Sequence, residues 1–298
     1  MFSGLRAFHF QQAEIFTNLV NFSHYLCGDK GLFDILNMEP IIQFSGADII
    51  NGETTVIYGL NLSVSKGDFV YIVGKVGTGK TSIIRTMIAE HPLEKGEGKV
   101  CGYDLKAIKD RDIPFLRRKL GVVFQDFQLL MDRSVHDNLL FVLEATGWKG
   151  EAEKESRIGE VLSAVGMERK AHKMPYQLSG GEQQRIAIAR AILNSPEAIL
   201  ADEPTGNLDA ETADGIMNLL CKLNREDGTA VVMVTHNLQL CEKYPGRVLV
   251  CKNESCEEMD REPQTENEDS EKAEQAENKP IEEENAADEL PTGAEDEK

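Results

Sequence analysis

The chain has 298 residues, 41% of them hydrophobic and 28% charged, so it is long enough to bury a large core. Its 32 basic and 51 acidic residues give a formal net charge of −19, which argues against a general nucleic-acid binder because such proteins need a positive face. No apolar run reaches the roughly 18 residues of a membrane span, and the start lacks a secretory signal pattern, so we expect neither.

Residues 1–40 come first in the chain and are rich in aromatic side chains, but they match no motif. Two interpretations of this N-terminal extension stay open. It is either a partner-binding helix or sequence upstream of the true start, with Met38 as the initiator.

Residues 41–252 alternate strand-like apolar runs with helical patterns, which predicts an α/β domain around a mainly parallel sheet. The segment that opens this body, IIQFSGADII, alternates like a strand. Further strands are predicted at Thr55–Tyr58, Asn61–Val64, Phe69–Val73, Leu120–Phe124, Ala198–Ala201, Ala230–Val234 and Arg247–Val250. Helices are predicted at Lys80–Ala89, Glu153–Val165, Gly180–Leu193 and Glu211–Glu226. The stretch of about 127–177 lacks strand signals and is interpreted as a helical insertion.

The acidic charge is concentrated at the C-terminal end. Residues 253–298 hold 19 Asp and Glu against four Lys and Arg, with almost no aromatic or β-branched residues, so an acidic disordered tail is expected. Six cysteines, at positions 27, 101, 221, 241, 251 and 256, are scattered and include no C-x-x-C pair. This usage predicts reduced thiols in a cytosolic protein, without a disulfide framework or zinc site.

A glycine-rich loop follows the predicted strand Phe69–Val73 and precedes a predicted helix. Its sequence, GKVGTGKT, matches G-x-x-x-x-G-K-[ST] at every fixed position. Glycines let the backbone turn its N–H groups toward a phosphate, and the helix N-terminus adds its positive dipole end. Lys80 is expected to reach the β- and γ-phosphates and Thr81 to offer a hydroxyl to Mg²⁺. The expected nucleotide-binding residues are Gly74, Lys75, Val76, Gly77, Thr78, Gly79, Lys80, Thr81 and Ser82.

Polar residues also follow three other predicted strands. Asp202 and Glu203 end an apolar strand, where adjacent carboxylates without a cation would be costly. Asp202 is therefore expected to hold Mg²⁺, and Glu203 to orient or deprotonate an attacking water. His236 is expected at the same sheet edge, within reach of a γ-phosphate. Gln125 is expected to touch Mg²⁺ or the water and to couple the nucleotide state to the helical insertion.

The segment LSGGEQ, residues 178–183, resembles the signature of the ATP-binding cassette (ABC) ATPases and lies between Gln125 and Asp202 as in that family. The resemblance implies a P-loop NTPase fold with a parallel sheet core, an antiparallel β subdomain and a helical insertion. It implies an ATPase that uses Mg²⁺ and pairs head-to-tail as a homodimer, each signature facing the ATP of the other subunit. His236 would be the switch histidine, and Asn207, Leu208 and Asp209 the D-loop at that interface. The signature residues are Leu178, Ser179, Gly180, Gly181, Glu182 and Gln183.

Within this family, the segments VFQDFQLLMDRSVHDN, LSGGEQQRIAIARAILN and ADEPTGNLD resemble the FtsE group of cell-division ATPases. This implies a permease-like membrane partner similar to FtsX, a role in cell division and cell-wall remodelling, and a peripheral position on the cytoplasmic side of the inner membrane. The alternative is the ATPase subunit of a lipoprotein-releasing or macrolide-type exporter, which shares ADEPTGNLD. The partner's docking groove is expected near residues 125–135.

One element departs from the family pattern. The position that usually stacks an aromatic ring on adenine lies in the stretch Asp48–Gly52, which has no aromatic residue. Adenine is expected to rest on Ile50, with less than the 1–3 kcal/mol or so that a base gains on an aromatic ring. Tyr58 is expected in the core.

Overall fold

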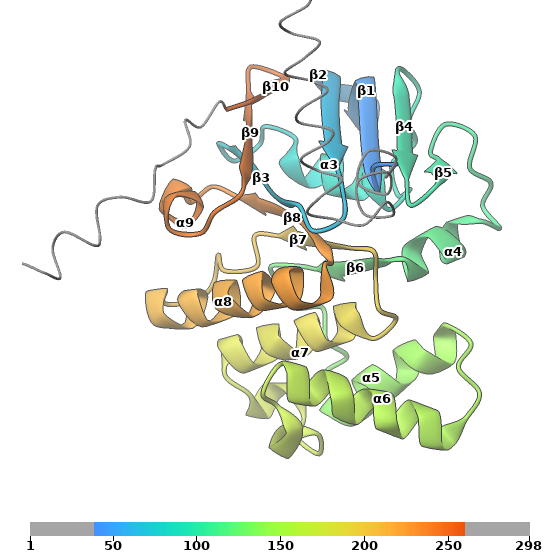
Figure 1. The fold of residues 1–298 in the computed structure, drawn as a ribbon, viewed down its shortest axis with the longest axis vertical. Coiled ribbons are helices and arrows are strands. Elements are labelled where there is room, and N and C mark those ends of the chain that lie inside the picture. The colour runs from blue at the N-terminus through green and yellow to red at the C-terminus, as the bar shows by residue number, and fades with distance from the viewer. Residues whose placement is uncertain (1–38, 260–298) are drawn as a thin grey trace, which may run out of the picture. The chain divides into compact units, whose positions relative to one another are not determined.

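The structure, a computed structural model, describes residues 39–259. These residues form two sheets and the helices that pack on them (Figure 1). The expectations for residues 1–38 and for the tail beyond residue 259 concern segments outside the described part of the chain. Within the described part, no helix has both the length and the apolar character needed to cross a membrane.

A six-stranded sheet with the order β10-β9-β3-β8-β7-β6 forms the centre. Five of its strands are parallel, and β10 pairs antiparallel with β9 at one edge. The strands are β3 (Phe69–Gly74), β6 (Leu120–Val123), β7 (Ala198–Asp202), β8 (Ala230–Thr235), β9 (Arg247–Lys252) and β10 (Ser255–Glu258). Their near-continuous apolar sequences are explained by burial on both faces, as expected for a parallel sheet. The predicted α/β fold with a mainly parallel sheet is confirmed.

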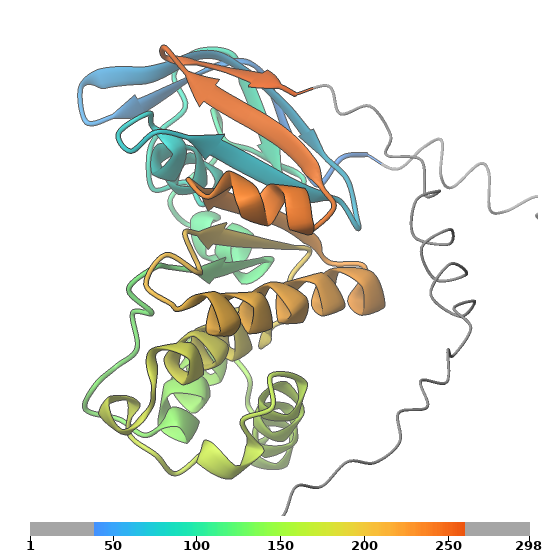
Figure 2. The same ribbon diagram turned by 90° about the vertical axis from the view of Figure 1, so that its left-hand side faces the viewer.

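Alternate residues of each central strand contribute to two separate cores. In β3, Val70 and Ile72 pack in a cluster with helix α3 and the second sheet. Tyr71 and Val73 face the opposite way and pack with the helices of the other side. Figures 1 and 2 show these layers, with α7 and α8 on one side of the sheet and α3 on the other.

The second sheet is antiparallel, with the order β2-β1-β4-β5. Its strands are β1 (Ile42–Asn51), β2 (Thr54–Val64), β4 (Glu97–Val100) and β5 (Tyr103–Asp104). The two strands predicted around Gly59 are one strand, β2, in which Gly59 takes a left-handed φ of 62°. The β1–β2 register shifts in this region, so the glycine bends the strand without ending it.

The helices carry capping signals that are visible in the sequence. Ser134, Ser179 and Asp209 each cap a helix by accepting from a backbone N–H three residues later. The helices are α3 (Lys80–Met87), α4 (Ile113–Arg118), α5 (Val135–Ala145), α6 (Glu151–Ala164), α7 (Gly180–Ile192), α8 (Ala210–Asp227) and α9 (Leu238–Lys243), with 3-10 turns at Glu168–Lys170 and Pro175–Gln177. Residues 127–177 hold α5, α6 and both 3-10 turns.

The prediction of reduced thiols is wrong for two cysteines, because Cys251 and Cys256 form a disulfide. They are direct partners across the β9–β10 hairpin, with Cα atoms 4.1 Å apart, a register that brings the two side chains together. Because the predicted folded body ends at residue 252, before β10, Cys256 was not expected opposite Cys251.

We expect this disulfide to stabilise the fold by about 2 kcal/mol, because it closes a short loop in the unfolded chain. The free energy of unfolding, measured by denaturant titration, should fall by that amount when a reductant is added. Cys256→Ser should remove the dependence on reductant. Burial raises the pKa of the Cys101 thiol to about 12, so this thiol does not compete for pairing. Equal stability of the wild type with and without reductant would contradict the expectation.

Candidate active site

The site lies at the edge of the sheet where the parallel strands end. Strands β3, β8, β7 and β6 are neighbours in that order, so their carboxyl ends share one edge. The glycine loop follows β3, Asp202 ends β7, His236 follows β8 and Gln125 comes shortly after β6. This is the edge at which open α/β sheets bind their ligands.

The glycine loop is shaped by two positions that admit no side chain. A Cβ at Gly74 would collide with the carbonyl oxygen of Cys251 on the neighbouring strand β9. Gly79 caps α3 with a left-handed φ of 88°, and a Cβ there would lie 2.8 Å from a methyl group of Val56. The loop therefore turns tightly between β3 and α3, with its N–H groups at the start of a helix.

Lys80 holds the loop together. Its ammonium group donates hydrogen bonds to the carbonyl oxygens of Gly74, at 2.9 Å, and Lys75, at 2.8 Å, and the residue is only 5% exposed. Burial lowers the pKa of Lys80, and the charges of Glu203 and Asp202 oppose that shift. The cation is thus fixed at the loop with two carboxylates near it.

The first carboxylate, Asp202, faces the start of helix α3. The Thr81 hydroxyl donates a hydrogen bond to Asp202 Oδ1 over 3.2 Å. Burial raises the pKa of Asp202, and the charge of Glu203 adds to this, while the bond from Thr81 and the charge of Lys80 act against it. A carboxylate and a hydroxyl from distant parts of the chain therefore meet at this point.

The second carboxylate, Glu203, has a left-handed backbone with a φ of 48°. Its N–H donates to the carbonyl oxygen of Val234 on β8, and its Oε2 lies 2.9 Å from His236 Nδ1. Left-handed non-glycine residues cost roughly 1–3 kcal/mol and persist where the surroundings enforce them. The strand end thus turns the Glu203 carboxylate toward His236.

Gln125 contacts the D-loop in this structure. Its amide Nε2 donates to Asn207 Oδ1 over 3.2 Å, and Asn207 Nδ2 donates back to the Gln125 carbonyl oxygen over 3.3 Å. Gly206 lies beside this pair, since a Cβ there would be 3.0 Å from Gln125 Nε2 and 3.4 Å from Glu203 Oε2. Gln125 and Glu203 therefore both border Gly206.

The signature segment begins α7 with a capping box. Ser179 Oγ accepts from the Glu182 N–H, and the Glu182 carboxylate accepts from the Ser179 N–H. The bond from the Ser179 backbone, with that from Lys170, lowers the pKa of Glu182. A Cβ at Gly180 would lie 3.4 Å from Leu208, so the signature and the D-loop are adjacent. Among the described residues, the Ser179 hydroxyl forms its hydrogen bond inside this capping box, with the Glu182 N–H.

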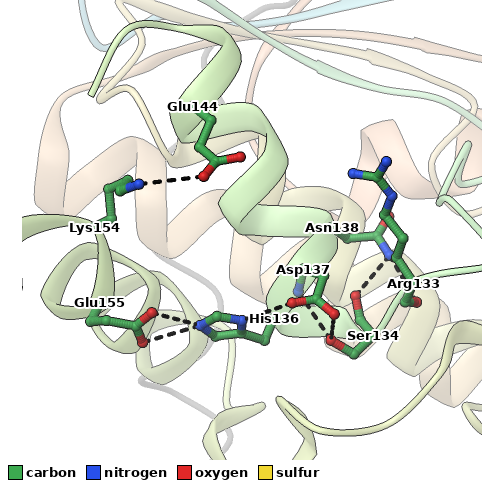
Figure 3. Close-up of polar contacts among 8 residues, drawn as sticks. All are labelled: Arg133, Ser134, His136, Asp137, Asn138, Glu144, Lys154 and Glu155. Atoms are coloured by element: carbon green, nitrogen blue, oxygen red, sulfur yellow. Dashed lines mark hydrogen bonds and ion pairs between the residues drawn. The ribbon is translucent and has the colours of Figure 1, made fainter. Parts of the chain in front are cut away.

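Asn138 is a residue whose role the sequence analysis missed. It is 2% exposed, its Oδ1 accepts from the Leu130 N–H, and its Nδ2 donates to the carbonyl oxygens of Leu130, Arg133 and Ser134. Figure 3 shows Asn138 beside Arg133 and Ser134. One side chain thus shapes the loop between Gln125 and α5. Its only sequence signal is a polar residue on the apolar face of a helix.

The helices α5 and α6 are tied together by two polar contacts, both drawn in Figure 3. Lys154 lies 3.4 Å from Glu144, and His136 contacts Glu155 and Asp137. Burial opposes charge on His136, but its bonds to the two carboxylates outweigh burial and raise its pKa. A raised histidine pKa stabilises the fold at low pH, and this contribution is lost as pH rises through the folded-state pKa.

The stretch expected to meet adenine offers aliphatic side chains and no aromatic ring. Ile50 is partly buried and pairs with Thr55 across the β1–β2 hairpin, and Val56 packs on Gly79 of the glycine loop. Tyr58 is not in the core as expected, because its side chain is 50% exposed. Its N–H donates to the Glu254 carbonyl oxygen in the β9–β10 turn.

Known proteins resemble this chain in sequence and in structure. A family model described as ABC transporter matches residues 57–206, half of the chain. The cell division ATP-binding protein FtsE of Streptococcus pneumoniae serotype 2 is 46% identical over 200 residues, 67% of this chain and 86% of that protein. FtsE of Escherichia coli is 39% identical over 198 residues, 66% of this chain and 88% of that protein. A dimeric post-hydrolysis structure of the ATP-binding cassette MJ0796 with ADP and Pi has a TM-score of 0.65 and 33% identity, covering 74% of this chain and 99% of that one.

These likenesses and the site geometry define the class: the chain belongs to the ABC transporter family and is an ATP-binding, ATP-hydrolysing cassette. Within the family it is similar to the FtsE proteins of several bacteria, at 39–46% identity. The resemblance drawn from the signature and Gln125 segments is confirmed.

Lys80→Ala should weaken ATP binding by about tenfold or more, because it removes both the phosphate cation and the two bonds that hold the loop. Binding is measured by equilibrium fluorescence titration. Lys66→Ala is the matched control, since Lys66 is an exposed lysine in the turn before β3, outside the glycine loop, and the ATP affinity of this variant should change by less than about threefold. Unchanged ATP affinity in Lys80→Ala would refute the assignment of the loop.

Proposed function

We propose that this protein is the ATPase subunit of an FtsEX-like complex. In this proposal it couples ATP-driven closure of two cassettes to a permease-like membrane partner in cell division and cell-wall remodelling. The support is the likeness to the FtsE proteins together with the geometry at the sheet edge, above all the Glu203–His236 contact. The chain would then sit at the cytoplasmic side of the inner membrane, held there by its partner.

Magnesium fits the residues at the sheet edge. Thr81 and Asp202 present oxygen atoms, which Mg²⁺ prefers, and Gln125 lies at the same edge. No cluster of three or more His, Cys, Asp or Glu that could hold a metal occurs in residues 39–259. The ion would therefore depend on the nucleotide phosphates for its remaining ligands, as Mg²⁺ does in ATPases. When bound, Mg²⁺ neutralises charge on the β- and γ-phosphate oxygens.

In this proposal, Glu203 and His236 carry out the hydrolysis step. Glu203 orients the attacking water and takes its proton, because its carboxylate lies just after the end of β7, with its charge acting on Lys80 of the glycine loop. His236 holds that carboxylate in place through its contact with Oε2, and it would lie within reach of a bound γ-phosphate. Lys80 supplies an ammonium group for the phosphates, held at the loop by its hydrogen bonds to the carbonyl oxygens of Gly74 and Lys75.

The signature completes the site of a second copy of the chain. The α7 N-terminus offers Gly180 and Gly181 N–H groups at the positive end of a helix, a position suited to an anion. In this structure the signature is adjacent to Leu208 of the D-loop, and the D-loop in turn contacts Gln125. The dimeric MJ0796 cassette supports the pairing of two copies, and the head-to-tail arrangement is part of the proposal.

The membrane partner would dock on the surface that follows Gln125. Leu130, Met131 and Phe141 are exposed there, although all three are large and apolar. Arg133 stacks over the Phe141 ring at 4.7 Å, which puts a cation at the rim of this patch. Since Asn138 shapes the loop that carries Leu130, it would also shape the docking surface.

Glu203→Gln should keep ATP binding, lower turnover by a factor on the order of 100 or more, and trap a closed dimer in ATP. Phosphate release measures turnover, and size-exclusion chromatography in Mg-ATP detects the dimer. Glu226→Gln, an exposed change on α8, is the control and should behave as wild type. Undiminished hydrolysis in Glu203→Gln would remove Glu203 from its role.

Asn138→Ala should destabilise the fold by about 1–3 kcal/mol and also reduce binding to the membrane partner, because it releases the docking loop. Asn224→Ala is a matched control, since Asn224 Nδ2 also donates to three carbonyl oxygens but far from this surface. Both variants should lose a similar amount of stability. Only Asn138→Ala should also lose binding to the membrane partner, which is measured by co-purification from membranes. Equal retention of an FtsX-like partner by both would contradict the docking surface, and recovery of an exporter permease by the wild type would favour the alternative family role.

A further inference from the structure

Residues 125–128, called the Gln125 segment below, lead from Gln125 into the helical insertion and have an unfavourable backbone conformation. Phe127 and Gln128 both have left-handed φ values, 61° and 47°, and neither is glycine. Two consecutive residues of this kind persist only where surrounding contacts enforce them. The contacts of this segment therefore determine where Gln125 lies.

One arginine makes the decisive contacts. Arg190 Nη2 donates to the Phe127 carbonyl oxygen over 2.9 Å, and its Nη1 donates to the carbonyl oxygen of Gln128. A guanidinium presents its donors in a rigid fork, so it can hold two adjacent carbonyl groups in one geometry, which a single ammonium cannot do as well. Arg190 is partly buried, so water does not readily replace these bonds.

The same arginine belongs to the helix that the signature begins. Arg190 lies in the last turn of α7, and Gly180 lies in its first turn. The Phe127 ring reaches back to that first turn, since a Cβ at Gly180 would lie 3.8 Å from its Cζ. The segment is thus attached along α7 by a ring at one end and a hydrogen-bonded fork at the other. At its start, Gln125 is bonded to Asn207.

From these contacts we infer that Arg190 is a positioning residue, which fastens the Gln125 segment to helix α7 so that the segment and the signature move as one body. The inference rests on the proposed function, because it assumes that Gln125 and the signature both act at the nucleotide. Its consequence is that Arg190 governs turnover while the glycine loop binds ATP independently. The loop lies between β3 and α3, and α3 packs on the opposite face of the sheet from α7.

The test compares Arg190→Gln with Arg157→Gln, a control substitution that removes an equivalent pair of hydrogen bonds. Arg157 also forks onto two adjacent backbone carbonyl oxygens, those of Ile192 at 2.7 Å and Leu193 at 2.9 Å, at the end of the same helix α7 but away from the Gln125 segment. Arg190→Gln should lower kcat by about tenfold or more with ATP affinity changed by less than about threefold. Arg157→Gln should lose comparable thermal stability and keep kcat within about twofold.

A second variant tests whether backbone strain at Gln128 connects the loss of the Arg190 hydrogen bonds to the loss of kcat. Gln128→Gly places a residue that adopts a left-handed φ without strain where Arg190 now enforces one. Added to Arg190→Gln, it should restore a measurable part of kcat, which a merely structural role for Arg190 does not predict. If Arg190→Gln does not fold, Arg190→Lys, which keeps the charge without the fork, takes its place in both comparisons.

The inference is overturned if Arg190→Gln hydrolyses ATP at the wild-type kcat, if its loss of kcat only equals that of Arg157→Gln, or if Gln128→Gly gives no rescue. Failure of the proposed function looks different, because there the wild type itself, with Mg-ATP and its membrane partner, releases no phosphate. The assays are run on the full chain, with the wild type measured beside every variant.

Discussion

The parallel pairing of β7 with β8 is the contact on which the site depends. Asp202 lies opposite Val234, so the Glu203 N–H reaches the Val234 carbonyl oxygen and the carboxylate meets His236. The same register leaves Asp202 facing Thr81 at the start of α3. Because both faces of the sheet are buried, a shift of one residue would put core side chains on the wrong face and separate these groups.

Around this edge, irregular backbone is held by side chains. The turn at Glu203 and the segment at Phe127 and Gln128 have left-handed residues, and the loop before α5 has little regular structure. Hydrogen bonds from Asn138 and Arg190 supply what a helix or sheet ladder would otherwise provide. The parts of the chain that respond to nucleotide and partner in the proposed function are thus the parts with the least regular backbone.

Local sequence patterns predicted the elements whose chemistry is self-contained. The apolar strand before GKVGTGKT is β3, and the segment after Leu178 begins a helix because Ser179 and Glu182 form a capping box within four residues. The short elements β4, β5, α4 and α9 were not predicted, because each has six residues or fewer and depends on its neighbours. The disulfide was missed for the same reason, since Cys256 meets Cys251 only through the pairing of β10 with β9.

The sequence by itself determined the family, the α/β class and the residues that can carry phosphate and water chemistry, because these depend on motifs a few residues long. The tertiary structure decided which of those residues touch. It bonds Gln125 to Asn207, 82 positions away, and Arg190 to a backbone more than 60 positions away. Contacts at such separations depend on strand order, register and helix packing, and no local pattern of residue types encodes them.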